Sequence, residues 1–153
     1  MTIHSSVSTV YVENTSDRFK GKGTQGEYLS YIPPVKWYSS IAQDIPMKGT
    51  VSNLHVEMAA DVNGTQNRYF GLYGTETRTS DYTLFDASLG CALAYSKTNT
   101  IDVNIFAGNI FDKIYQSNLS RLKYFENYSA SPNGRLGIYG MGRNIGITAV
   151  LHF

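Results

Sequence analysis

The sequence predicts an all-β protein, an antiparallel up-and-down meander of about six strands that each cross a membrane. Three observations support this. Apolar and polar residues alternate in six separate segments, and alternate side chains of a strand point to opposite faces. No run of about 18 apolar residues is present, so a transmembrane helix is not predicted. The connections between segments are long and short in turn, as in membrane barrels.

Composition fits this class. Of the 153 residues, 16% are charged and 13% are aromatic, with 12 Tyr, 7 Phe and 1 Trp. Low charge and abundant tyrosine are typical of sheets and of membrane barrels with aromatic girdles. A net charge of +1 indicates no nucleic-acid partner. The single cysteine, Cys91, excludes an internal disulfide and a cysteine metal cluster.

The first two predicted strands flank a long polar connection. Residues 3–12 alternate roughly, which predicts a strand. A Gly-rich loop over 13–34 follows, and its Lys20-Gly-Lys-Gly23 segment could bind an anion; no strand–helix context frames the glycines, so a surface loop is the simpler interpretation. Pro33-Pro34 favours extended backbone, so the second strand is predicted over 35–42.

The third predicted strand, residues 51–61, follows a short turn over 43–50. His55 and Glu57 share its polar face and could contribute to a metal site. Two ligands are too few, so neither a metal nor a cofactor is predicted. A polar barrel interior explains both residues more simply, and Asp86 is predicted to face that interior with them.

The remaining strands follow the same alternation. A polar stretch over 62–81 leads to the fourth strand, 82–95, and a tight turn over 96–99 leads to the fifth, 101–108. The longest connection, 110–142, precedes the last strand.

The last strand, residues 143–153, has one fully apolar face. That face is Ile145, Ile147, Ala149, Leu151 and Phe153. The length is close to the ~9–11 residues that a tilted strand needs to cross a bilayer. The strand resembles the closing strand of bacterial outer-membrane barrels, whose terminal Phe and alternate apolar residues are the signal for the barrel assembly machinery.

The alternation of connection lengths also predicts an orientation. Outer-membrane barrels have short periplasmic turns and long outer loops. If the carboxy terminus lies on the periplasmic side, the last connection lies outside the cell. Because six is an even number of strands, the amino terminus is then also periplasmic.

Four stretches together resemble one family, the TonB-dependent outer-membrane receptors. They are Asn109-Ile-Phe-Asp-Lys-Ile-Tyr115 with Ser117-Asn-Leu-Ser-Arg121, similar to N-L-F-D-K-x-Y … H-L-S-R; Met141-Gly-Arg-Asn144, similar to P-G-R-N/T; Gly26-Glu-Tyr-Leu-Ser-Tyr-Ile-Pro-Pro34, similar to G-x-P-L-P-x-I-P-P; and Asp81-Tyr-Thr-Leu-Phe-Asp-Ala-Ser88, similar to G-Y-T-L-x-N/D-A-S. Met141 stands where the family has Pro, and Asn118 where it often has His. The stretches occur in the family's order and at the corresponding strands.

The resemblance implies that residues 1–153 are the carboxy-terminal part of such a receptor, an incomplete wall of a barrel of about 22 strands. The plug, the TonB-binding segment and the earlier strands are expected to be missing, from a truncated gene or an internal start. Residues 1–10 lack the basic and long apolar regions of a signal peptide.

The resemblance also implies a function, the uptake of a scarce nutrient such as a ferric siderophore, haem or cobalamin across the bacterial outer membrane. The expected partners are outer-membrane lipid, the small-molecule ligand, and TonB through the missing segment. Ligand recognition would fall to outer loops, where Arg and Tyr suit anionic chelates. The candidates are Arg68, Tyr69, Tyr73, Arg121, Lys123, Tyr124 and Arg135.

Other interpretations remain open. A complete small outer-membrane barrel of about eight strands would suit the length, and a soluble lipocalin-like barrel would place the apolar faces inward. No enzyme is predicted, because the three histidines fall on different predicted strands and no nucleophile motif is present.

Overall fold

A computed structural model describes residues 1–96, 98–124, 126–127 and 135–153 of the chain. Six strands form one antiparallel sheet in the order β1-β2-β3-β4-β5-β8. Their bounds are β1 Thr2–Ser8, β2 Lys36–Pro46, β3 Val51–Asn63, β4 Tyr82–Ala94, β5 Thr100–Gly108 and β8 Asn144–His152. The sheet is a meander, because each strand pairs with the strand before it in this order. It is not closed, since β1 and β8 do not pair with each other.

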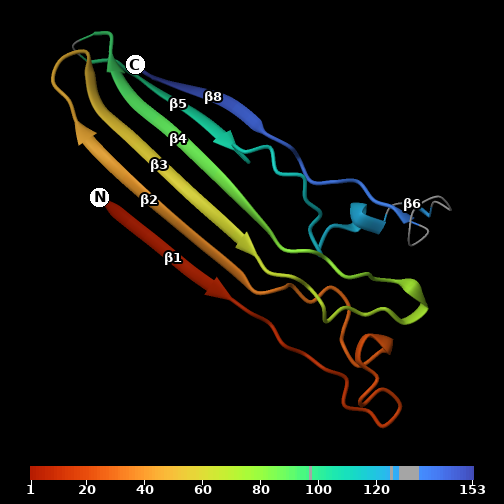
Figure 1. Cartoon of the computed structure of the whole chain (residues 1–153). Helices are drawn as coiled ribbons and strands as arrows, with labels where there is room; N and C mark the ends of the chain where they lie inside the picture. Colours follow the sequence, from red (N-terminus) through yellow and green to blue (C-terminus); the bar gives the residue numbers. More distant parts are fainter. Residues whose placement is uncertain (97, 125, 128–134) are drawn as a thin grey trace.

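Figure 1 shows the sheet as a long curved layer with its connections sorted between its two ends. The short turns β2–β3 and β4–β5 lie at one end, toward which both termini also lie. Three long connections lie at the other, over residues 9–35, 64–81 and 109–143. We call these the first, second and third connections, and their end of the sheet the loop end. The predicted alternation of long and short connections is confirmed.

Strand β1 is shorter than predicted, because it ends at Ser8 and not at residue 12. The last pair of its ladder is Ser8 with Lys36. Beyond Val35, the residues that would continue the partner strand are Pro34 and Pro33, which have no backbone N–H to donate. Residues 9–12 therefore alternate in the sequence, but β2 does not extend far enough to pair with them.

Strand β2 is longer than predicted, and the first half of the expected turn over 43–50 is strand. Gln43 to Pro46 pair with Val56 to Asn53 of β3. Pro46 lies at the last position of β2, where a missing N–H costs least. The chain then reverses through Gly49, whose φ of 110° lies in the region that favours glycine.

Small elements occur within the long connections, which the sequence predicted to be irregular. They are the 3-10 helices η1 Gly23–Gln25, η2 Leu72–Gly74 and η3 Arg121–Tyr124, and the short antiparallel pair β6 Glu126–Asn127 with β7 Arg135–Leu136. No helix within the described part of the chain has the length and apolar character needed to cross a membrane.

The register joins the apolar residues of all six strands into one face, which we call the apolar face. Directly paired residues point to the same side of a sheet. One row across the middle of this face runs Gln43, Val56, Leu89, Ile105 and Ile147. No apolar side chain is buried among the described residues, and Ile147 is 69% exposed. The sheet therefore has no hydrophobic core, and nothing in the described chain covers this face.

The opposite side, which we call the polar face, collects the other set of each strand. The predicted set His55, Glu57 and Asp86 lies on it, as the register shows. Carboxylates outnumber cations there; the charged residues are Lys36, Asp44, Glu57, Asp61, Asp86 and Asp102. At Gly146 the ring of Phe106 from β5 lies over the backbone, so that a Cβ would come within 2.3 Å of Phe106 Cζ. An aromatic ring over a glycine of a neighbouring strand covers backbone that would otherwise be open.

Candidate functional site

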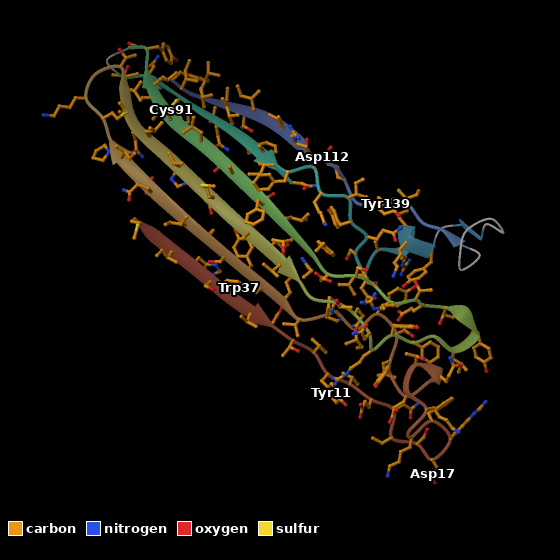
Figure 2. All side chains as sticks on the ribbon, in the orientation of Figure 1. Tyr11, Asp17, Trp37, Cys91, Asp112 and Tyr139 are labelled. Atoms are coloured by element: carbon orange, nitrogen blue, oxygen red, sulfur yellow. The ribbon has the colours of Figure 1, made fainter. Side chains whose placement is uncertain are left out.

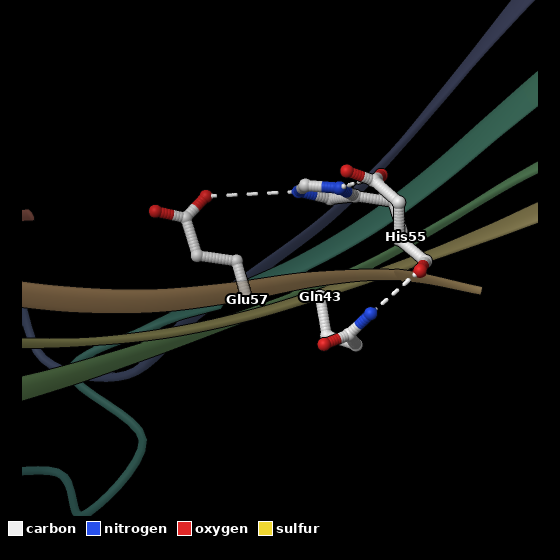
Figure 3. A network of polar contacts seen from close by, with 4 residues as sticks. Gln43, His55 and Glu57 are labelled. Carbon is white, nitrogen blue, oxygen red and sulfur yellow. Dashed lines mark hydrogen bonds and ion pairs between the residues drawn. The ribbon is translucent and has the colours of Figure 1, made fainter. Parts of the chain in front are cut away.

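A small polar network occupies the turn end of the polar face (Figure 3). His55 Nδ1 lies 2.8 Å from Asp44 Oδ1, and His55 Nε2 lies 4.0 Å from Glu57 Oε2. Gln43, from the apolar face, donates through Nε2 to the backbone carbonyl of Asp44 at 2.7 Å. No group of three or more His, Cys, Asp or Glu side chains suited to a metal ion occurs among the described residues. His55 is thus held between two carboxylates of its own sheet.

A second pair lies on β5 and β8, where His152 Nε2 is 2.8 Å from Asp102 Oδ2. Toward the loop end, Lys36 Nζ lies 2.9 Å from Asp61 Oδ2. Asp86 Oδ1 accepts a hydrogen bond from the Asn109 backbone N–H at 2.8 Å. Asp86 therefore ties the start of the third connection to the sheet.

Asn109, the first residue of the stretch Asn109–Tyr115, makes three side-chain hydrogen bonds within the third connection. Its side chain accepts from the Lys113 N–H at 2.8 Å and donates to the carbonyls of Lys113, at 2.9 Å, and Met141, at 3.3 Å. Its φ is 49°, a conformation that asparagine tolerates better than most residues. This residue joins the beginning of the third connection to its end.

Asp112 makes a second link between the beginning and the end of the third connection (Figure 2). Its Oδ1 accepts from the Arg143 N–H at 2.8 Å. A Cβ at Gly142 would come within 2.7 Å of the same oxygen, so the close approach requires glycine there. The stretches Asn109–Tyr115 and Met141–Asn144 are far apart in the sequence but form one structural unit.

A buried junction joins all three connections. The Ile32 carbonyl accepts from Asn118 Nδ2 at 2.8 Å and from Gln66 Nε2. Gln66 and Thr79 exchange backbone hydrogen bonds at 2.9 and 3.2 Å, and Thr79 Oγ1 donates to Asn118 Oδ1 at 3.3 Å. Asn118 is only 2% exposed. Buried amides with their hydrogen bonds satisfied rigidify a structure, so we infer that the three connections form a single packed layer.

Lys123 completes the junction from the third connection. Its ammonium donates to the carbonyls of Thr77 at 3.1 Å and Arg78 at 2.9 Å, and to Thr79 Oγ1 at 2.6 Å. Burial lowers the pKa of Lys123 to about 8, against a smaller opposing effect of the Glu76 carboxylate. The Lys123 ammonium, predicted to bind ligand, has three acceptors within the protein, and its role in ligand binding stays a prediction.

The backbone N–H groups of the Lys20-Gly-Lys-Gly23 segment are also occupied by hydrogen bonds within the protein. The N–H groups of Gly21 and Gly23 donate to the two carboxylate oxygens of Glu27 at 2.9 and 2.8 Å. These bonds lower the pKa of Glu27. The segment does bind an anion, but the anion is a side chain of the same loop.

The other predicted ligand-binding residues are spread over the loop end. The Arg68 guanidinium lies 4.4 Å from the centre of the Tyr11 ring, which is a cation–π contact. Tyr73 is 81% exposed on η2 of the second connection, and Tyr69 of the same connection is partly exposed. Arg121 is exposed on η3.

The candidates whose side chains are described do not all line one cavity. The Tyr124 hydroxyl lies 3.2 Å from the Thr77 backbone N–H, which ties it to the second connection. Arg135 belongs to β7, but its side chain lies outside the described part of the structure. Arg68 lines a cavity between the first and second connections, whereas Lys123 lines another between the second and third.

The cavity that Lys123 lines holds residues that the sequence analysis did not select. They are Arg78, Lys113, Tyr82, Tyr115 and Tyr139. Lys113 and Tyr115 lie within the N-x-F-D-K-x-Y stretch, so the motif contained a signal for this place. The motif alone does not indicate that residues 78–82 line the same cavity.

Comparison with known proteins shows the fold. A solved structure aligns with 80% of this chain at a TM-score of 0.52 and 17% sequence identity. That structure is the copper transporter OprC. The chain spans 18% of the length of the OprC chain. No family model and no curated protein matches the sequence.

Proposed function

We propose that this chain forms part of the wall of a large outer-membrane β-barrel, in a receptor of the TonB-dependent type that takes up a scarce nutrient. One observation carries the membrane assignment: the apolar residues of six strands form a continuous face, and no apolar side chain is buried among the described residues. A soluble protein exposes single apolar residues but not a patch of this extent.

The polar face supports the same proposal. In a large barrel the strands alternate between lipid-facing and interior-facing residues, and the interior is polar. The two faces here differ in this way, with the His–carboxylate pairs and the Lys36–Asp61 pair all on one side. A lipocalin-like barrel would need the apolar side chains inside a closed sheet. The described sheet is open, and its apolar side chains are exposed.

The receptor type is proposed from the four family-like stretches, supported by the way in which they meet. Asn109 contacts Met141, Asp112 contacts Arg143, and Asn118 contacts Ile32. Residues that are characteristic of a family are expected where separate segments must fit together. The likeness to a transporter agrees with transport, while the nutrient itself is not indicated by the fold.

Size-exclusion chromatography tests the membrane assignment. Without detergent the refolded chain is expected to elute as large aggregates, because water meets the apolar face and both edge strands have unpaired backbone groups. In detergent micelles the aggregates should disappear and a sheet signal in circular dichroism should remain.

A lysozyme-sized soluble β protein, refolded in the same buffers, is the control and should be monomeric in both. A sharp, folded monomer peak of this chain in the absence of detergent would contradict the proposal and favour a soluble barrel.

A further inference from the structure

The apolar face continues past the strands onto the third connection. The Phe85 ring, on the apolar face of β4, meets the Phe111 ring of this connection edge to face, with the ring centres 5.3 Å apart and the planes at 85°. The Ile110 N–H donates to the Phe85 carbonyl at 2.8 Å, which holds the connection beside β4. Phe111 and Met141, near the two ends of the third connection, are each 70% exposed. The third connection therefore adds apolar surface where the apolar face reaches the loop end.

Arg143 lies at this border of the apolar face. It directly precedes Asn144, the first residue of β8, which pairs with Gly108 of β5. The alternation of β8 places Arg143 on the same side as Ile145, a residue of the apolar face. Arg143 is exposed. The apolar face thus carries a guanidinium at its loop-end border.

The Arg143 guanidinium has no partner within the described chain. Its side chain forms no hydrogen bond or ion pair with a described residue. Asp112, which lies where β5 leads into the third connection (Figure 2), accepts through Oδ1 from the Arg143 backbone N–H at 2.8 Å. This bond fixes the backbone of Arg143 and leaves all guanidinium donors available for an acceptor outside the chain.

The same border of the apolar face has a different composition at β2. Trp37 lies on the apolar face there and is 47% exposed. Lys36, the residue beside it, lies on the polar face, and its ammonium pairs with Asp61 at 2.9 Å. An aromatic ring is therefore present at β2 without a free cation from the adjacent residue, whereas the border at β8 combines apolar side chains with a free guanidinium.

We propose that Arg143, Phe111 and Met141 bind the headgroup region of a phosphate-bearing lipid in the outer face of the membrane. The acyl chains would lie along the apolar face beside Ile145 and Phe85, and the guanidinium would donate to the phosphate oxygens at the end of the chains. A guanidinium matches phosphate with two parallel hydrogen bonds, and a cation at the membrane surface attracts anionic lipid. The inference rests on the proposed function, for which it names a specific lipid partner.

The test is the quenching of an indole beside the site by brominated lipids. Phe111→Trp in a Trp37→Phe background places the single indole of the chain next to Arg143. In vesicles that contain varied fractions of dibrominated phosphatidic acid or dibrominated phosphatidylcholine, the quenching gives the relative association constant of the two lipids at that indole. Phosphatidic acid should associate about fivefold more strongly, because no cationic choline masks its phosphate. Arg143→Gln should bring the ratio close to one.

Two controls address general attraction between charges. Native Trp37, at the same end of the sheet but on β2, should show a ratio close to one. Arg121→Gln removes the same charge from an exposed residue of η3, outside the six-stranded sheet, and should leave the ratio at the introduced indole unchanged. Equal association of the two lipids, a preference that persists in Arg143→Gln, or the same preference at Trp37 would overturn the proposal.

The same titrations separate this inference from the proposed function. Quenching without a preference for phosphatidic acid would overturn the phosphate site and leave the membrane assignment intact. Absence of quenching by either lipid at both indoles would contradict the membrane assignment, and the phosphate site would fall with it. All variants must retain the wild-type strand signal in circular dichroism, which excludes misfolding as the cause of a lost preference.

Discussion

Ile147→Arg is expected to lower the free energy of unfolding of the lipid-embedded sheet by about 2–4 kcal/mol, the cost of a cation on the lipid-facing side of a barrel strand near mid-membrane. Ile147 pairs with Ile105 in the row across the middle of the apolar face. Its side chain is 69% exposed and has no polar partner to receive a guanidinium. In the proposed barrel that exposure is to hydrocarbon, where an arginine cannot be solvated without distorting the bilayer.

Thr148→Arg is the matched control, one residue further along β8 and on the polar face. Thr148 pairs with Asn104 and lines a hollow that also contains His55 and Asp102. An arginine there can reach water or a carboxylate, so the loss should be well below that of Ile147→Arg. Urea unfolding in phospholipid vesicles, followed by circular dichroism, gives both values. Equal losses for the two variants would show that the assignment of the faces is wrong.

Lys123→Met is expected to loosen the buried junction between the second and third connections by about 2–3 kcal/mol, since removing a donor leaves buried acceptors unsatisfied at a cost of about 1–3 kcal/mol each. Methionine retains much of the volume of the stem but cannot donate. The carbonyls of Thr77 and Arg78 and the hydroxyl of Thr79 would each lose their contact with the ammonium.

Hydrogen exchange measures this effect locally. Gln66 and Thr79 bond to each other through their backbone amides directly beside the Lys123 ammonium. Both amides should exchange faster by about a factor of 30 or more in Lys123→Met, which is the kinetic equivalent of about 2 kcal/mol. Arg121→Met, on the same 3-10 helix but exposed, should leave the exchange of both amides unchanged. The same exchange rates in wild type and Lys123→Met would show that the ammonium does not stabilise the junction.

The strands could be predicted from the sequence because their alternation is a local property of the chain. The ends of the strands could not, since pairing decides them. Residues 9–12 alternate but face a proline pair that cannot donate hydrogen bonds, and Gln43 interrupts the apolar pattern of β2 yet pairs with Val56. Both errors at the ends of strands arise from a neighbouring strand that the local pattern does not include.

The arrangement of the connections at the loop end could not be predicted from the sequence, because it also depends on contacts between distant segments. Arg, Lys and Tyr were chosen there by residue type, which is blind to how the connections fold on one another. Lys123 was chosen as a ligand-binding residue of an outer loop, and it is only 8% exposed. Arg78 was not selected, although it lines the same cavity as Lys113 and Lys123. The quoted motifs contain Asn109, Asp112 and Asn118, but the partners of these residues became visible only in the structure.

The central claim is that the apolar face of this sheet meets lipid, and the single tryptophan tests it without any mutation. Trp37 lies on the apolar face of β2 near the loop end, is 47% exposed, and donates through Nε1 to Ser5 Oγ at 2.9 Å (Figure 2). In the proposed barrel it lies near the outer membrane–water interface, where tryptophan is enriched.

The measurement is the quenching of Trp37 fluorescence in vesicles of brominated phospholipid. The account predicts strong quenching by lipids brominated near the headgroup end of the acyl chain, weaker quenching by lipids brominated near the terminal methyl, and little quenching by acrylamide in the water. Full quenching by acrylamide with no effect of either brominated lipid would contradict it.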